Sequence, residues 1–185
     1  MKQSFLTFAL IFLCTLYGVE QQGILKTTLD KDSIINFRVF DTKTKMIDAT
    51  KSKETIKELV HSGNNDDLML QHSQKDELGI THYFYQQLYK GIKVENAMYA
   101  AHTKNGFIES VNGSFLKVGE VEINAKLSEK EALDRALGAT QAQSYKWQID
   151  AEEQLIKKVK NDKSASFFPK GELVIFYNQA TKGLI

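Results

Sequence analysis

The chain has 185 residues, of which 42% are hydrophobic and 25% are charged, and its formal net charge is +1. This balance indicates a globular protein of one domain or two small ones, and it gives no reason to expect a nucleic-acid partner. The chain has only one proline, which excludes an extended proline-rich linker.

The first eighteen residues have the pattern of an export signal. Lys2 supplies a positive charge, and the run from Phe5 to Leu16 is apolar but too short to cross about 30 Å of hydrocarbon as a helix. Cleavage after Gly18 removes Cys14, the only cysteine, and brings the formal charge to zero. We therefore expect an exported protein, secreted or periplasmic, with no membrane association after cleavage and no disulfides.

Residues 19–47 are predicted to be a lead-in segment, within which the apolar and β-branched run over residues 34–40 favours a strand. A helix is predicted from Ser52 to His61, and Gly63 is placed to end it in a left-handed conformation. Three apolar residues share one face of this helix at helical spacing: Ile56, Leu59 and Val60.

The stretch from Leu78 to Val118 is predicted to form a curved antiparallel meander. Asn105-Gly106 lies between two apolar runs and is typical of a two-residue hairpin turn, because both residues tolerate positive φ. A second pair, Asn112-Gly113, predicts another turn shortly afterwards. The first strand of the meander is rich in aromatic residues, which suits a half-buried sheet surface: Tyr83, Phe84, Tyr85 and Tyr89.

Beyond the meander, Ser128 and Glu131 have the spacing of a capping box, which predicts a helix that ends at Gly138. The buried stripe of this helix, packed on a sheet, is expected to consist of Leu133, Ala136 and Leu137. Residues 155–159 and 172–177 are predicted as strands. Since a strand as apolar as the second normally has neighbours on both sides, we expect the chain to be a fragment of a longer precursor.

The fold class predicted from these elements is α+β, with antiparallel curved sheets that each pack against a short helix. His82 and His102 lie in neighbouring strands and are expected to meet. Two histidines without a third ligand make a poor zinc site, so local hydrogen bonding is favoured. Motifs for zinc proteases, serine hydrolases and phosphate loops are absent from the sequence. We therefore expect no catalytic residue, no metal ligand and no cofactor in this chain.

Residues 79–94, GITHYFYQQLYKGIKV, resemble the signature of the fungalysin/thermolysin propeptide (FTP) domain. That signature has a histidine in an aromatic strand, a glutamine, then Tyr-x-Gly and a β-branched x-Val pair. Residues 105–106 and 111–113 match its hairpin turns, and residues 127–133 resemble the start of the PepSY-like region that follows in such propeptides.

The resemblance implies an FTP domain over residues 48–120 and a truncated PepSY-like domain over residues 121–185. Three residues depart from the usual pattern, at positions expected to affect surface contacts more than the fold: Phe84 in place of arginine, Lys93 in place of proline and Asn96 in place of glycine. The signature positions are expected to serve the fold and the interface with a partner, not catalysis: His82, Gln87, Tyr89, Gly91, Val94, Gly106, Asn112 and Gly113.

In function, the resemblance implies the prosegment of a secreted zinc metalloprotease. It would act in cis as an intramolecular chaperone and inhibitor of its catalytic domain, and zinc is expected only in that domain. The alternative is a free-standing exported protease inhibitor or protein-binding module that acts in trans. The coding sequence beyond Ile185 would distinguish the two hypotheses.

Overall fold

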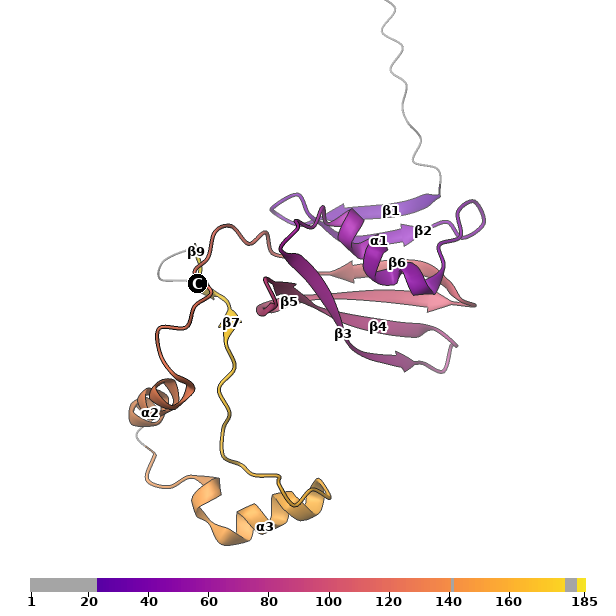
Figure 1. Ribbon diagram of the computed structural model, residues 1–185. Coiled ribbons are helices and arrows are strands. Elements are labelled where there is room, and N and C mark those ends of the chain that lie inside the picture. The colour runs from indigo at the N-terminus through magenta and orange to yellow at the C-terminus, as the bar shows by residue number, and fades with distance from the viewer. Residues whose placement is uncertain (1–22, 141, 179–182) are drawn as a thin grey trace, which may run out of the picture.

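The computed structural model describes residues 23–140, 142–178 and 183–185. Its main feature is a sheet whose antiparallel strands follow the order β1-β2-β6-β5-β4-β3 (Figure 1). The strands are β1 (Ile24–Leu29), β2 (Ile35–Phe40), β3 (Asp66–Lys75), β4 (Thr81–Tyr89), β5 (Ile92–Lys104) and β6 (Phe107–Gly113). The antiparallel meander predicted for residues 78–118 is confirmed by β4, β5 and β6. The predicted signal peptide, residues 1–18, lies outside the described residues.

The segment predicted as a lead-in supplies, from residue 24 on, two strands of this same sheet. β2 pairs with β6, and β1 pairs with β2 at the sheet edge. Ile34 and Phe40 are buried in the main core, so the second half of this segment contributes to the core, whereas β1 is exposed after Ile24.

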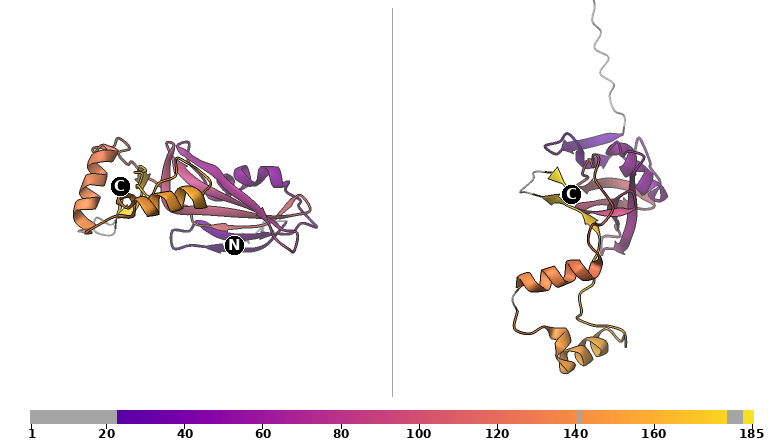
Figure 2. Two further views of the ribbon diagram at one scale, coloured as in Figure 1. Left: turned by 90° about the horizontal axis from the view of Figure 1, so that it is seen from below. Right: turned by 60° about the vertical axis from the view of Figure 1, so that its left-hand side comes forward.

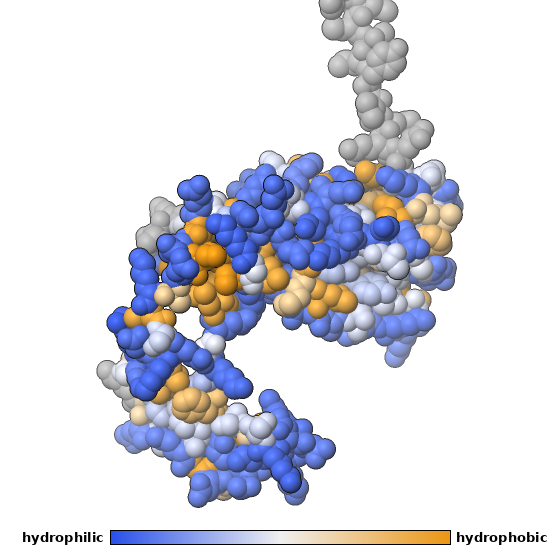
Figure 3. Space-filling view, in the orientation of Figure 1, coloured by the Kyte–Doolittle hydropathy of each residue, from blue (hydrophilic) through white to orange (hydrophobic). Residues whose placement is uncertain are grey.

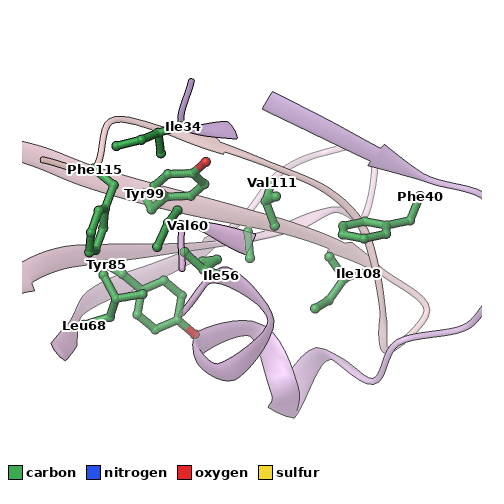
Figure 4. Close-up of a cluster of buried hydrophobic side chains, with 11 residues drawn as sticks. Ile34, Phe40, Ile56, Val60, Leu68, Tyr85, Tyr99, Ile108, Val111 and Phe115 are labelled. Carbon is green, nitrogen blue, oxygen red and sulfur yellow. The ribbon is translucent and has the colours of Figure 1, made fainter. Parts of the chain in front are cut away.

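Helix α1 (Ser52–Leu59), which follows a 3₁₀ turn (Ala49–Lys51), packs across one face of the sheet. Ile56 and Val60 are almost fully buried and Leu59 is half-buried, which confirms the predicted apolar face. Gly63 does not end the helix as predicted, because His61 takes the left-handed conformation with φ of 50°. The core beneath α1 is drawn in Figure 4 and comprises Ile34, Phe40, Ile56, Val60, Leu68, Tyr85, Tyr99, Ala101, Ile108, Val111 and Phe115.

Tyr99 lies at the centre of this core with 1% of its surface exposed, and its hydroxyl donates a hydrogen bond to the carbonyl of Ile35. Burial raises the pKa of Tyr99 to about 12. The folded state therefore keeps this proton up to a higher pH than the unfolded chain, whose tyrosines ionise around pH 10. The stabilisation is complete below about pH 10 and is lost as the pH rises towards 12.

Replacing Tyr99 by phenylalanine is therefore expected to remove part of the alkaline destabilisation. Between pH 9 and 12 the free energy of unfolding of Tyr99→Phe should fall by about 2 kcal/mol less than that of the wild type. Urea unfolding followed by circular dichroism at each pH measures the difference. Tyr177→Phe is the control, because Tyr177 is 53% exposed. Parallel alkaline curves for the wild type and Tyr99→Phe would contradict the expectation.

The C-terminal part forms a small lobe that is set apart from the sheet (Figure 2). It contains α2 (Glu129–Thr140), a 3₁₀ turn (Lys146–Gln148) and α3 (Asp150–Val159). The predicted capping box is confirmed, since the Ser128 backbone N–H donates to the Glu131 carboxylate at 2.9 Å and the Glu131 N–H donates to the Ser128 hydroxyl at 3.2 Å. The predicted end at Gly138 is wrong, because α2 continues through that residue.

The predicted buried stripe of α2 is also wrong. Leu133 and Leu137 are half-buried and Ala136 is exposed, so this helix does not pack on the sheet as expected. It is held within the lobe by polar contacts instead. The Glu129 carboxylate accepts from the Gly171 backbone N–H at 2.8 Å, and the Tyr145 hydroxyl donates to the Leu137 carbonyl at 3.0 Å.

Residues 155–159, predicted as a strand, belong to α3. Acidic residues occupy the first turn of this helix, and Lys157 and Lys158 occupy its last turn. Both arrangements interact favourably with the helix dipole, and three apolar residues are too few to impose a strand period on such a segment.

Close by, the Trp147 ring stacks on Tyr145 with 4.4 Å between ring centroids and meets Phe168 edge-on.

The predicted strand over residues 172–177 is broken into two short pieces. β7 (Val174–Ile175) runs parallel to β5, whereas β8 (Tyr177–Asn178) pairs with β9 (Gly183–Leu184). β7 lies beside the first residues of β5, on the edge that β6 occupies further along. A second buried cluster forms there from Tyr89, Val94, Ala97 and Ile175.

Candidate functional site

Two adjacent glutamines of β4 are buried polar side chains within the meander. Gln87 is fully buried, and its amide pairs with the backbone of Leu116 like a neighbouring strand. Its Nε2 donates to the Leu116 carbonyl at 2.8 Å, and its Oε1 accepts from the Leu116 N–H at 2.9 Å. Nε2 also donates to Asp66 Oδ1 at 3.1 Å. Gln87 therefore joins the start of β3 and the segment after β6 to β4.

Gln86, which the sequence analysis did not single out, fills a bulge in β5. The pairing register jumps between Gln86 and Leu88, so that several residues of β5 lie opposite one residue of β4. The Gln86 Nε2 lies within hydrogen-bond distance of three carbonyls, those of Val94 at 2.7 Å, Ala97 at 3.0 Å and Gln87 at 3.1 Å. These contacts hold the bulge that leads β5 towards β7.

Tyr89 and Val94 belong to the second buried cluster, in which Ile175 of β7 packs against them. Apolar residues gather around this junction of β5 and β7 in the space-filling view (Figure 3). A hollow of about 830 Å³ lies close by, and its lining includes Leu116, Val121 and Leu184. This junction connects the sheet to the C-terminal segment.

Gly91 and Gly106 each lie in a two-residue hairpin turn. Lys90-Gly91 joins β4 to β5, and Asn105-Gly106 joins β5 to β6, with positive φ at both residues of each turn. The first predicted Asn-Gly turn is therefore confirmed.

The second predicted Asn-Gly turn is wrong, because Asn112 and Gly113 are the last residues of strand β6. A Cβ atom on Gly113 would lie 2.3 Å from the Met98 carbonyl oxygen and 2.6 Å from the Tyr99 Cα. Glycine is thus required at this position by the close approach of β5 and not by a turn.

His82 and His102 meet as predicted, on the sheet face opposite α1. Their Nδ1 atoms are 2.6 Å apart, and the rings are edge-on with 4.9 Å between centroids. The other ring nitrogen of His82 lies 3.2 Å from Asp76 Oδ2, and that of His102 contacts Asn112 Oδ1. Four side chains therefore form one continuous hydrogen-bonded chain across the β3–β4 turn, β4, β5 and β6.

The meander also has a counterpart among known families. Residues 66–115 match the model of the Fungalysin/Thermolysin Propeptide Motif. The chain therefore contains an FTP motif. The match begins at the first residue of β3 and ends at Phe115, a member of the main core. All eight predicted signature residues lie within the FTP motif, and the motif is that of propeptides of thermolysin- and fungalysin-type proteases.

The three departures from the usual FTP pattern each have a contact or a conformation that accommodates them. Phe84 stacks on His72 with 4.5 Å between ring centroids. Lys93 forms ion pairs with Glu95 at 3.1 Å and Glu172 at 3.6 Å, and the hydrogen bond to Glu95 raises the pKa of Lys93. Asn96 has φ of 61°, a conformation that asparagine tolerates better than most residues.

The eight signature residues do not converge on one catalytic centre. His82 and Asn112 belong to the hydrogen-bonded chain of side chains on the face opposite α1. Tyr89 and Val94 belong to the second cluster, and the two turn glycines lie at opposite ends of β5. Within the described ranges, no group of three or more histidine, cysteine or acidic residues is placed to hold a metal ion. None of the helices described in the structure is long and apolar enough to span a membrane.

Proposed function

We propose that this chain is the prosegment of a secreted fungalysin- or thermolysin-type zinc metalloprotease. It acts as an intramolecular chaperone and inhibitor of a catalytic domain that is joined to it in the precursor. The FTP motif over residues 66–115 is the observation that carries this proposal. Residues 1–18 act as the export signal, and residues 121–185 act as a second, PepSY-like part of the prosegment.

A prosegment needs only modest intrinsic affinity because it is tethered to its enzyme. A short flexible connection gives an effective concentration of about 1 mM, so a contact with a Kd of about 1 μM keeps the complex closed about 10³-fold over open. Cutting the connection removes this advantage, and degradation of the released piece makes activation irreversible. A free-standing inhibitor lacks the tether and therefore needs a much lower Kd.

The surface that supports docking is the outer edge of β3. Among the described strands, β3 pairs only with β4, and its residues from Met69 to Lys75 are exposed. Met69 and Leu70 are about half exposed, at 46% and 49%. An exposed edge of this length can add a strand from a partner through main-chain hydrogen bonds, which is a common mode of peptide recognition. We assign this edge to contact with the catalytic domain.

The proposal is tested by adding the purified mature chain to thermolysin and measuring both peptide hydrolysis and recovery of activity after denaturation. We expect inhibition with a Kd near 1 μM and faster recovery of activity. Inhibition in trans with a Kd below about 1 nM would instead favour the free-standing inhibitor. The absence of both effects, with thermolysin and with a fungalysin, would count against the two hypotheses.

The edge assignment predicts that Met69→Lys weakens inhibition about tenfold, because a lysine on a strand edge opposes pairing with a further strand. The free energy of unfolding of Met69→Lys should differ from that of the wild type by less than about 0.5 kcal/mol, since Met69 is exposed. Met46→Lys is the matched control, because Met46 is 65% exposed in the loop before α1. Equal inhibition constants for Met69→Lys and the wild type would exclude this edge.

A further inference from the structure

The hydrogen-bonded chain of Asp76, His82, His102 and Asn112 needs one more N–H proton than two neutral imidazole rings carry. Asp76 is an acceptor when ionised, and the backbone N–H of Ile80, followed by the contact with His82, lowers its pKa. His82 must then carry its proton on Nε2 to bind Asp76. With Asn112 presenting Oδ1, His102 must also carry its proton on Nε2.

A neutral imidazole has only one N–H proton. If both rings are neutral, the two Nδ1 lone pairs face each other across 2.6 Å with nothing to bond them. One additional proton resolves this, because it is donated by one Nδ1 and accepted by the other. The resulting single positive charge is balanced by Asp76 at the end of the chain. Both rings are only partly exposed, which limits replacement of this bond by water.

We propose that His82 and His102 share one proton at neutral pH and that a second proton breaks the pair, so that acid loosens the face of the sheet opposite α1. Two imidazolium rings at this distance repel each other, and neither retains an acceptor for the other.

No other charged group of the neighbouring strands described here takes the place of Asp76 beside the two histidines. On the β3 side, the titratable group of this face is His72. Its ring stacks on Phe84, and Phe84 separates it from His82. On the β6 side, Ser110 pairs with His102 in the register, and Glu109 lies next to it at a register shift. β2 contributes Val39 opposite Ser110, and Lys26 of β1 lies over the Phe37 ring. Asp76 is therefore the carboxylate that contacts the pair directly.

Proton linkage then has a definite sign. Two independent imidazoles of the unfolded chain titrate around pH 6.5. In the proposed folded pair, one proton bridges the two Nδ1 atoms, and a second proton removes the acceptor that this bridge requires. Below pH 6.5 the two histidines bind more protons in the unfolded chain than in the folded chain. Above pH 6.5 they bind fewer protons in the unfolded chain than in the folded chain. The contribution of the pair to stability is therefore bell-shaped, with its maximum around pH 6.5 and losses on both sides.

The test uses the full mature chain with ¹⁵N-labelled histidine. At pH 6.5 we expect the Nδ1 resonances of His82 and His102 to report a single shared proton, with Nε2 protonated on both rings. Two neutral rings, or two rings that titrate independently of each other, would overturn the proposal. This measurement involves no protease, so its outcome is separate from that of the inhibition assay.

A second measurement compares urea unfolding between pH 4.5 and 8.5 for the wild type and His102→Gln, with His72→Gln as the control from the same face. The ratio of unfolding constants between wild type and His102→Gln should change about tenfold on moving from pH 6.5 to either 5 or 8. His72→Gln should show no such maximum.

Discussion

Replacing Gly113 by alanine is expected to destabilise the sheet by about 3 kcal/mol. The added methyl group would lie 2.3 Å from the Met98 carbonyl oxygen and 2.6 Å from the Tyr99 Cα, both of which are backbone atoms of β5. A flexible side chain could move aside, but here β5 and β6 themselves must separate. The strain falls next to Tyr99, the largest fully buried side chain of the core.

Gly106→Ala is the matched control for this substitution. Gly106 has φ of 83° and open space around its Cβ position, so alanine should cost only about 1 kcal/mol through backbone strain. Urea unfolding followed by far-UV circular dichroism measures both variants. Tryptophan fluorescence is unsuitable, because Trp147 reports on the C-terminal lobe. Equal losses in the two variants would mean that close packing at Gly113 is unimportant.

The two Asn-Gly pairs show how far the local sequence determines the fold. Asn105-Gly106 forms the predicted turn because its neighbours on both sides can pair with each other across two residues. Asn112-Gly113 has the same composition but continues a strand, since β2 and β5 already pair with β6 on its two sides. The reason for Gly113 is the position of Tyr99, which is distant in sequence, and no local pattern contains it.

The C-terminal lobe was predicted less well than the sheet for a related reason. The meander repeats a two-residue period over many positions, whereas residues 155–159 offer only three apolar side chains, which fit a helix or a strand. The charges at the two ends of α3 favour the helix. Gly138 was expected to end α2, but a solvent-exposed glycine inside a helix costs only about 1 kcal/mol relative to alanine.

Part of the candidate site could be predicted from strand order alone. His82 and His102 lie in adjacent strands of a meander, so their contact followed from the hairpin register. Their outer partners did not, because Asp76 comes from a turn and Asn112 was assigned to one. Gln86 was missed because its partners, the carbonyls of Val94 and Ala97, come within reach only through the register shift between β4 and β5. The available signal was a pair of glutamines in an otherwise aromatic strand.

Replacing Gln87 by leucine is expected to destabilise the sheet by about 3 kcal/mol, although the two side chains have similar size. The loss is expected because the Leu116 N–H and carbonyl would both lose the amide that bonds them, in a region where water has limited access. Asp66 would lose its Nε2–H donor as well. Since small domains unfold with about 5–15 kcal/mol, this is a large share of the total.

The matched control for Gln87→Leu is Gln74→Leu, which makes the same substitution at an exposed position of β3. Its free energy of unfolding should change by less than about 0.5 kcal/mol. Hydrogen exchange gives a second readout, because in Gln87→Leu the Leu116 amide should lose its protection while the amides of Tyr99 and Val111 keep theirs relative to the lowered global stability. If the Leu116 amide stays protected, Gln87 does not hold the segment after β6. The same polar pairing explains why a fully buried glutamine is stable in an aromatic strand, since both polar atoms of its amide have hydrogen-bond partners.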